Sequence, residues 1–234
     1  MSRFNLGRRS LEPELMDCPD LNWNEHREAL EGLERINSFS LAVEPIWRAL
    51  TENSLGSSRL KILDIATGAG DLPLVLAKKA KQNGFDFKIN ACDKSPQAVK
   101  YAQQKADQDG VDIHFFSLDI KKEKIPTGYD ILINALFLHH LSADETVSFI
   151  QNLKSASPKM IILNDLSRTH FGFFLAYAGT RFLSRSKVVH YDGPQSVKAA
   201  YTIPEISELA EEAGLRHFKI QPFWPARFLL TWKN

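Results

Sequence analysis

The segment LKILDIATGAGD, residues 60–71, decides the fold. Its first six residues form an apolar run typical of a buried strand, and a glycine-rich turn follows directly. Residues 72–82 have the pattern of a helix. The glycines and alanines of the turn let a ligand lie against the backbone, and the helix N-terminus offers free N–H groups. The segment therefore predicts a strand–loop–helix unit that binds a nucleotide-like ligand.

Strands and helices alternate along the chain after this unit. Further strands are predicted at 87–92, 111–116, 129–135 and 160–163, with helices at 96–106 (N-cap Ser95) and from about 142. This alternation implies parallel strands joined by right-handed crossovers, with helices on both faces. Two last strands, 216–222 and 227–232, predict an antiparallel hairpin. The expected fold class is α/β, a doubly wound and mostly parallel sheet with an antiparallel C-terminal hairpin.

The chain divides into two parts near the turn-rich residues 53–58. Residues 1–54 are expected to form an extended arm followed by a helical lid, with helices at 24–36 and about 40–51. Residues 55–234 form the main domain. Within it, 169–193 is an apolar, aromatic insertion between the fifth strand and the hairpin.

Composition excludes several classes of protein. Lys plus Arg is 29 and Asp plus Glu is 28, so a net charge of +1 offers no strong overall attraction for nucleic acid or an anionic membrane. The two cysteines, Cys18 and Cys92, cannot form a disulfide framework and fit a reducing compartment. The sequence pattern predicts no signal peptide and no membrane-spanning segment. A cytoplasmic protein without stable membrane insertion is expected, and its oligomeric state stays open.

Three ligands could use the glycine-rich loop. A dinucleotide would want a third glycine where Pro73 stands, and a phosphate-binding loop would want Gly-Lys-Ser/Thr, which is absent. S-adenosyl-L-methionine has no phosphate and carries a positive sulfonium. Asp64 and Asp71 flank the loop and would repel a pyrophosphate. The sign of these charges favours S-adenosyl-L-methionine.

Acidic residues at the ends of the next two strands support that ligand. Asp93 ends the second predicted strand, where a carboxylate can accept both ribose hydroxyls. Asp119 follows the third strand and is expected to accept from the adenine amino group, with Ile120 near the ring. The predicted cofactor-binding set is Asp64, Ala66, Thr67, Gly68, Gly70, Asp93, Lys94, Asp119, Ile120 and Asn134.

The texts LDIATGAGDLP, ACDKSP, FFSLDI and YDILINALFLHHL together resemble class I S-adenosylmethionine-dependent methyltransferases. The closest likeness is to bacterial polyketide-associated and ubiquinone/menaquinone-type methyltransferases. The motifs PELMD at 13–17 and NDLSR at 164–168 also resemble the polyketide-associated group. The resemblance covers about residues 55–234. It implies a Rossmann-like, seven-stranded sheet of order 3-2-1-4-5-7-6 with strand seven antiparallel. Ala66 stands where the family loop has its first glycine.

Methyl transfer needs an aligned nucleophile and exclusion of water. A phenol, with a pKa of about 10, also gains from a general base, worth roughly 10²–10⁴-fold. His139 and His140, just past the fourth strand, are the first candidates for this base, and His190 is the next. Either of the first two could instead pack in the core or cap the next helix. A metal is not expected, because Asp64, Asp93 and Asp119 are already assigned to binding the ligand or ordering the loop.

Substrate-binding candidates surround the same strand ends. Phe137 could lie near the sulfonium or belong to the core. Asp165 and Arg168 could hydrogen-bond a substrate or pair with each other. In the insertion, Tyr177 and Tyr191 are candidates, and Phe173, Phe174, Phe182 and Leu183 are expected to line an apolar pocket unless this is an ordinary core helix. Arg181, Arg185 and Lys187 are expected to face water. The lid is expected over the donor, with Arg35 or Asn37 reaching its carboxylate.

Together these features predict an S-adenosylmethionine-dependent methyltransferase that acts on a small aromatic or apolar acceptor, by O-methylation of a phenolic or polyketide-derived hydroxyl. C-methylation of a quinol is one alternative. A protein that binds S-adenosylmethionine without catalysis is another. An NAD-dependent oxidoreductase is disfavoured by Pro73 and the paired loop acids.

Overall fold

The computed structural model describes residues 6–18, 20–39, 43–53 and 59–234, and within them a seven-stranded sheet of order β3-β2-β1-β4-β5-β7-β6. The strands are β1 (Leu60–Ile65), β2 (Phe87–Asp93), β3 (His114–Ser117), β4 (Ile131–Ala135), β5 (Met160–Leu166), β6 (Lys219–Phe223) and β7 (Arg227–Lys233). The first five are parallel, and β7 is antiparallel to both β5 and β6. The predicted sheet order and the antiparallel hairpin are confirmed.

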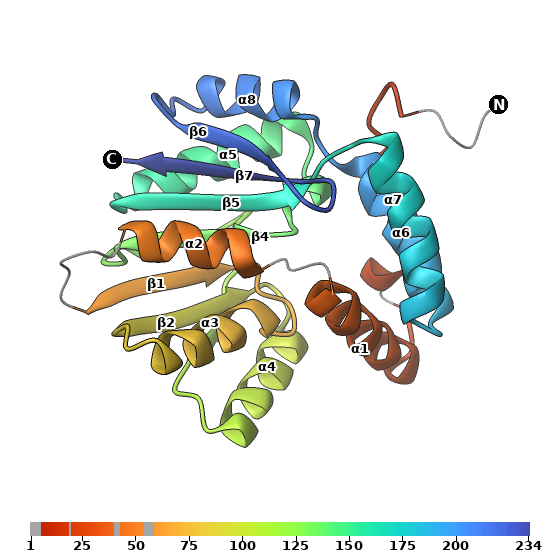
Figure 1. Ribbon diagram of the computed structural model, residues 1–234, viewed down its shortest axis with the longest axis horizontal. Helices are drawn as coiled ribbons and strands as arrows, with labels where there is room; N and C mark the ends of the chain where they lie inside the picture. Colours follow the sequence, from red (N-terminus) through yellow and green to blue (C-terminus); the bar gives the residue numbers. More distant parts are fainter. Residues whose placement is uncertain (1–5, 19, 40–42, 54–58) are drawn as a thin grey trace.

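Eight α-helices are described, in two groups. On the faces of the sheet lie α2 (Val43–Asn53), α3 (Asp71–Gln82), α4 (Pro96–Asp109), α5 (Ala143–Ser155) and α8 (Ile203–Glu212). The other three, α1 (Trp23–Phe39), α6 (His170–Leu183) and α7 (Lys187–Ala199), pack on one another. They form a side layer beyond the carboxyl ends of the parallel strands, at the right of Figure 1. Among the described residues, no helix is long and apolar enough to cross a membrane.

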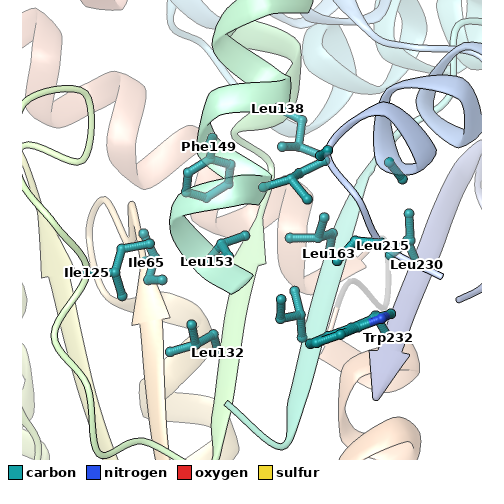
Figure 2. Packing of buried hydrophobic residues seen from close by; sticks show 14 of the residues in the cluster. Ile65, Ile125, Leu132, Leu138, Phe149, Leu153, Leu163, Leu215, Leu230 and Trp232 are labelled. Carbon is teal, nitrogen blue, oxygen red and sulfur yellow. The ribbon is translucent and has the colours of Figure 1, made fainter. Parts of the chain in front are cut away.

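The sheet is buried on both faces, which explains why its central strands are continuous apolar runs. Neighbouring residues of β1 point to opposite faces: Leu63 packs in a cluster with α5 and α8, and Ile62 packs in a cluster with α2 and α3. Figure 2 shows the first cluster, in which Leu132, Leu163 and Trp232 of the sheet pack with Phe149 and Leu153 of α5. The rigid sheet fixes the positions of the loops at its carboxyl edge.

Several predicted boundaries are wrong for local reasons. The third strand begins at His114 rather than 111, because the Gln103 side chain bonds the backbone of Ile113 and Phe115 and holds this stretch against α4. The fifth strand extends to Leu166, which pairs with Arg227 of β7. The arm is not fully extended, since Leu15–Asp17 form a 3-10 helix. The predicted N-cap Ser95 is confirmed, since its side chain accepts from the Ala98 N–H. Ser142, near which the next helix was expected to begin, is the N-cap of α5.

Candidate cofactor and acceptor site

The glycine-rich loop between β1 and α3 is tight on one side and open on the other. Ala66, Gly68 and Gly70 all have positive φ angles, of 56°, 56° and 77°. A Cβ atom on Gly70 would lie 2.8 Å from the Cβ of Ala102 and 2.9 Å from the ring of Phe115, so glycine is required for packing. A Cβ atom on Gly68 would meet nothing within 4 Å. The loop therefore presents bare backbone at Gly68, where a ligand can lie close.

Asp93 joins this loop to the end of β2. Its Oδ2 accepts from the backbone N–H of Gly68 at 2.9 Å, and its Oδ1 accepts from the N–H of Ser95 at 2.9 Å. Each carboxylate oxygen keeps a further lone pair, so the group is held in place and can still accept from hydroxyls. Lys94, the next residue, is exposed. This geometry fits the predicted interaction with a ribose.

Asp64 and Asn134 lie beneath the loop. Asp64 is 2% exposed, and burial raises its pKa to about 7, although the Thr67 hydroxyl donates to its Oδ2 at 2.5 Å. Its position makes it a support for the loop rather than an open ligand. Asn134 is fully buried and donates from Nδ2 to the carbonyl of Ile65 at 2.8 Å. Its Oδ1 has no hydrogen-bond partner in the described part of the chain.

Asp119 follows β3 and faces its own loop. Its carboxylate lies 3.1 Å from the Lys122 ammonium and accepts from the Lys121 N–H at 3.1 Å. The Lys122 hydrogen bond is the main reason that the pKa of Asp119 is lowered. Ile120 is half-buried beside it. A hydrogen bond to an adenine amino group stays a prediction, and it would use the remaining lone pairs.

The acceptor side is built around a buried carboxylate at the end of β5. Asp165 is 1% exposed, and its Oδ1 lies 2.7 Å from Nδ1 of His139. Its Oδ2 accepts from the N–H groups of Phe137 and His139, at 3.0 and 3.3 Å. Burial alone would raise the pKa of Asp165, but the interactions with His139 and the Leu166 N–H outweigh it and lower the pKa.

An ionised Asp165 fixes the tautomer of His139. The carboxylate can only accept, so the proton of the neutral ring resides on Nδ1 and Nε2 keeps its lone pair. Nε2 lies 3.9 Å from Oε1 of Glu14, and the ring centroid lies 4.3 Å from that of the exposed His140. Ligand atoms of these three side chains all lie within 4.8 Å of one another, so they could also hold a metal ion.

The other predicted acceptor residues lie elsewhere. Arg168 is buried and donates to the carbonyls of Leu6 and Ala200 while pairing with Glu205, so the alternative ion pair with Asp165 is not formed. His190 lies on α7, and its ring nitrogen Nε2 lies 2.8 Å from the carbonyl of Ser184, which follows α6. His190 therefore orders the α6–α7 connection.

The prediction that the insertion's aromatic side chains line a pocket is largely wrong. Phe174 and Phe182 are 64% and 88% exposed, and Tyr177 and Tyr191 are also exposed. Only Phe173 is buried, in a cluster with Leu6 and Val197. The exposed positions of Arg181, Arg185 and Lys187 are as predicted. When a helix carries apolar residues on all sides, the periodicity of its sequence does not show which side faces the core.

Part of the chain that contains this site matches a known protein family. Residues 62–157 match the family model described as a methyltransferase domain. This chain carries a methyltransferase domain. The match spans β1 to the end of α5 and thus includes the donor loop, Asp93 and His139. The resemblance to class I S-adenosylmethionine-dependent methyltransferases is confirmed.

Individual relatives of the methyltransferase domain are distant. A ubiquinone/menaquinone biosynthesis C-methyltransferase, UbiE, from Rickettsia felis is 30% identical over 78 residues, which are 33% of this chain and 30% of the relative. A solved S-adenosylmethionine-dependent methyltransferase from Aquifex aeolicus is 21% identical with a TM-score of 0.63, covering 90% of this chain and 98% of that chain. An O-methyltransferase family 2 protein from Planctomyces limnophilus, solved with apigenin, is 16% identical with a TM-score of 0.65, covering 92% and 63%. The two structures confirm the predicted Rossmann-like fold.

The N-terminal arm adds a part of the site that sequence reasoning missed. Arg9 stacks 3.5 Å over the Tyr201 ring and donates to the carbonyls of Ala199, Leu141 and His139. The backbone N–H groups of Leu15 and Met16 donate to the buried Asp192 on α7. These bonds bring Glu14 to the methyltransferase domain's His139. The motif PELMD contains Glu14, but no periodicity links it to a strand end so distant in the sequence.

The predicted lid helix packs on the insertion, and its place over the donor stays a prediction. Helix α1 packs on α6 and α7, and Arg35 donates to the Leu183 carbonyl at 3.0 Å. The side chain of Asn37 lies outside the described residues. The arm, rather than α1, therefore contacts the acceptor side of the methyltransferase domain.

Proposed function

We propose that this protein is an enzyme that transfers the methyl group of S-adenosyl-L-methionine to a phenolic hydroxyl of a small, apolar acceptor, with His139 as the general base. The observation that carries the proposal is the buried Asp165–His139 pair at 2.7 Å, at the carboxyl edge of the sheet that also holds the donor loop. Methyltransferases of both O- and C-specificity are among the relatives, so the chemistry of the domain supports transfer to either atom.

The donor site fits S-adenosyl-L-methionine by its shape and its charge. Gly68 offers open backbone, Asp93 offers carboxylate oxygens to the ribose, and Asp119 with Ile120 would take the adenine. When bound, this cofactor supplies a methyl group already activated by its sulfonium. Among the loop positions, none supplies the lysine that a phosphate loop uses.

The chain's own residues then act on the acceptor. His139 Nε2 would take the phenolic proton as the oxygen forms its bond to carbon, because its Nδ1–H is already held by Asp165. The ionised Asp165 stabilises the imidazolium that results. His139 is 5% exposed, and this burial limits the access of water to the base. Aligning the hydroxyl and accepting its proton are therefore the two tasks of this side of the site.

C-methylation of a quinol is the second candidate, favoured by the local identity to UbiE. The same base would serve it, since deprotonating a quinol hydroxyl also makes the ring carbon nucleophilic. The cytoplasm is the proposed location, where S-adenosyl-L-methionine and reduced thiols such as the exposed Cys18 coexist.

The test is turnover with a panel of phenols and quinols. Purified protein, S-adenosyl-L-methionine and each acceptor are incubated, S-adenosylhomocysteine is quantified, and the product is analysed by mass spectrometry and NMR. A new O-methyl signal supports the proposal, and a new ring-methyl signal supports the quinol alternative. Donor binding with no turnover on any acceptor contradicts catalysis and favours a binding protein.

A further inference from the structure

Helix α6 is apolar on two sides, but the described residues cover only one of them. The inner side carries Gly172, Phe173 and Thr180, which are buried. The outer side, termed here the α6 outer face, consists of Phe171, Phe174, Tyr177 and Phe182, which are 49%, 64%, 48% and 88% exposed. Helices that are apolar all round are normally buried on all sides. Something outside the described chain is therefore expected to cover this face.

Within the described part of the chain, the exposed aromatic side chains lie on or next to α6 and α7 and in the β6–β7 turn. Among the large apolar side chains that are exposed in the described residues, every aromatic one lies on α6, on α7 (Tyr191) or in the β6–β7 turn (Trp224). The Phe171 and Trp224 rings lie 5.5 Å apart, so the turn continues the α6 outer face. Both rings line an open, mostly apolar groove of about 560 Å³. A contiguous apolar surface of this kind marks a contact site.

The charged residues of α6 and of the start of α7 have a single sign. From residue 166 to residue 191 the sequence contains no Asp or Glu, while Arg181, Arg185 and Lys187 are all exposed. The Arg181 guanidinium lies 3.6 Å from the centre of the Tyr177 ring. The whole chain has a net charge of only +1, so these cations form a local concentration that the total conceals. Aromatic rings flanked by Arg and Lys are the composition of helices that lie in a membrane interface.

Charge also argues against a second copy of this protein as the partner that covers the α6 outer face. A two-fold contact would place the same patch on both partners and bring their cations together. An anionic lipid surface instead meets the cations with opposite charge and takes the aromatic rings at the headgroup level. Exposed acids do occur on α1, which packs against α6 and α7, so the attraction depends on the α6–α7 cations.

We propose that the α6 outer face, together with Trp224 and the cations Arg181, Arg185 and Lys187, docks this protein on an anionic lipid surface. The docking is peripheral and needs no spanning segment. It places the carboxyl edge of the sheet, where α6 begins, toward a source of apolar molecules. The inference stands on exposure and charge alone, so it does not require the proposed methyl transfer to be correct.

The experiment measures binding of the full chain to vesicles by flotation. Neutral phosphatidylcholine vesicles are compared with vesicles that contain about one third phosphatidylglycerol, at low and high salt. Wild-type protein is expected to bind the anionic vesicles and to lose binding as salt rises. The double variants Phe174→Ser/Phe182→Ser and Arg185→Glu/Lys187→Glu are each expected to bind the anionic vesicles at least 10-fold more weakly.

Matched controls lie on α3 and α4, which cover a face of the sheet rather than its carboxyl edge. Val75→Ser on α3 removes an exposed apolar side chain, and Lys81→Glu/Lys100→Glu reverses two exposed cations on α3 and α4. Both are expected to bind vesicles like wild type, and circular dichroism with donor-binding calorimetry checks that all variants fold. Absence of vesicle binding overturns the proposal, as does equal loss in the controls. The proposal is also overturned if the α6 variants bind vesicles like wild type but lose a dimer that wild type forms. The same holds if they lose binding to a single-stranded oligonucleotide instead.

Discussion

The donor half and the acceptor half of the carboxyl edge are assembled in different ways. The donor half draws on β1, β2 and β3 and the loops between them, so its contacts, such as Gly68 with Asp93, join neighbouring strand ends. The acceptor half brings together the end of β4, the end of β5 and the N-terminal arm. A site made of consecutive strand ends can be predicted from sequence spacing, whereas one that includes a distant arm cannot.

The largest expected effect tests the acceptor half. His139→Ala removes the group that would take the acceptor's proton, so turnover is expected to fall by about 10²–10⁴-fold while donor affinity is unchanged. His140→Ala, which removes the exposed neighbour, is the matched control and is expected to lose much less. Turnover is measured as S-adenosylhomocysteine release and donor affinity by calorimetry. Wild-type turnover in a folded His139→Ala protein would remove the base assignment.

The next effect tests the donor half. Asp93→Ala leaves ribose hydroxyls and the Gly68 N–H without their acceptor, so donor binding is expected to weaken by 10-fold or more. Asp112→Ala, an exposed acid just before β3, is the control and should bind the donor normally. Calorimetry with S-adenosylhomocysteine measures both. Unchanged affinity in folded Asp93→Ala protein contradicts the ribose assignment.

These two variants separate what sequence could and could not predict. Asp93 and the loop at 66–70 were predictable because both follow strands whose apolar runs are unmistakable. The sequence predicts Asp165 at a strand end with Arg168 as a possible partner, because its contact with His139 can be recognised only from three-dimensional distances. The outward-facing Phe174 and Phe182 were misassigned because α6 is apolar on both sides. The contact of Glu14 with His139 depends on hydrogen bonds of the arm that leave no periodic pattern.

A smaller effect concerns stability and the support beneath the donor loop. Burial raises the pKa of Asp64 from 3.8 to about 7 in the folded protein. The folded state therefore holds an extra proton between these values, so this group's contribution to stability is present below about pH 4 and is lost as the pH rises through 7. Asp64→Asn, which stays neutral, is expected to remove this part of the pH dependence.

Urea unfolding from pH 5 to pH 8 measures the difference. Wild-type protein should lose more stability than Asp64→Asn across this window, while Asp86→Asn, at an exposed acid, should follow wild type. Parallel curves for wild type and Asp64→Asn would mean that Asp64 is ionised in the folded protein. The loop would then rest on a buried charge, to which the Thr67 hydroxyl donates.

The smallest effect tests the contribution of the arm to the acceptor half. Glu14 Oε1 lies 3.9 Å from His139 Nε2, too far for a hydrogen bond but close enough to stabilise an imidazolium by about 1 kcal/mol or more. Glu14→Gln is therefore expected to lower turnover by a few-fold to tenfold at unchanged donor affinity, and Glu12→Gln, an exposed acid on the same arm, is expected to have no effect.

Treatment with a chelator distinguishes two roles for the Glu14 carboxylate. If Glu14 acts by its charge alone, treatment with EDTA leaves turnover unchanged, in keeping with the expectation of no metal. If EDTA abolishes turnover and zinc restores it, Glu14, His139 and His140 are metal ligands and His139 cannot be the free base. The contact of Asp165 with His139 would then orient His139 as a metal ligand rather than as a base. A carboxylate that holds Nδ1–H leaves the lone pair of Nε2 available to a metal as well as to a proton.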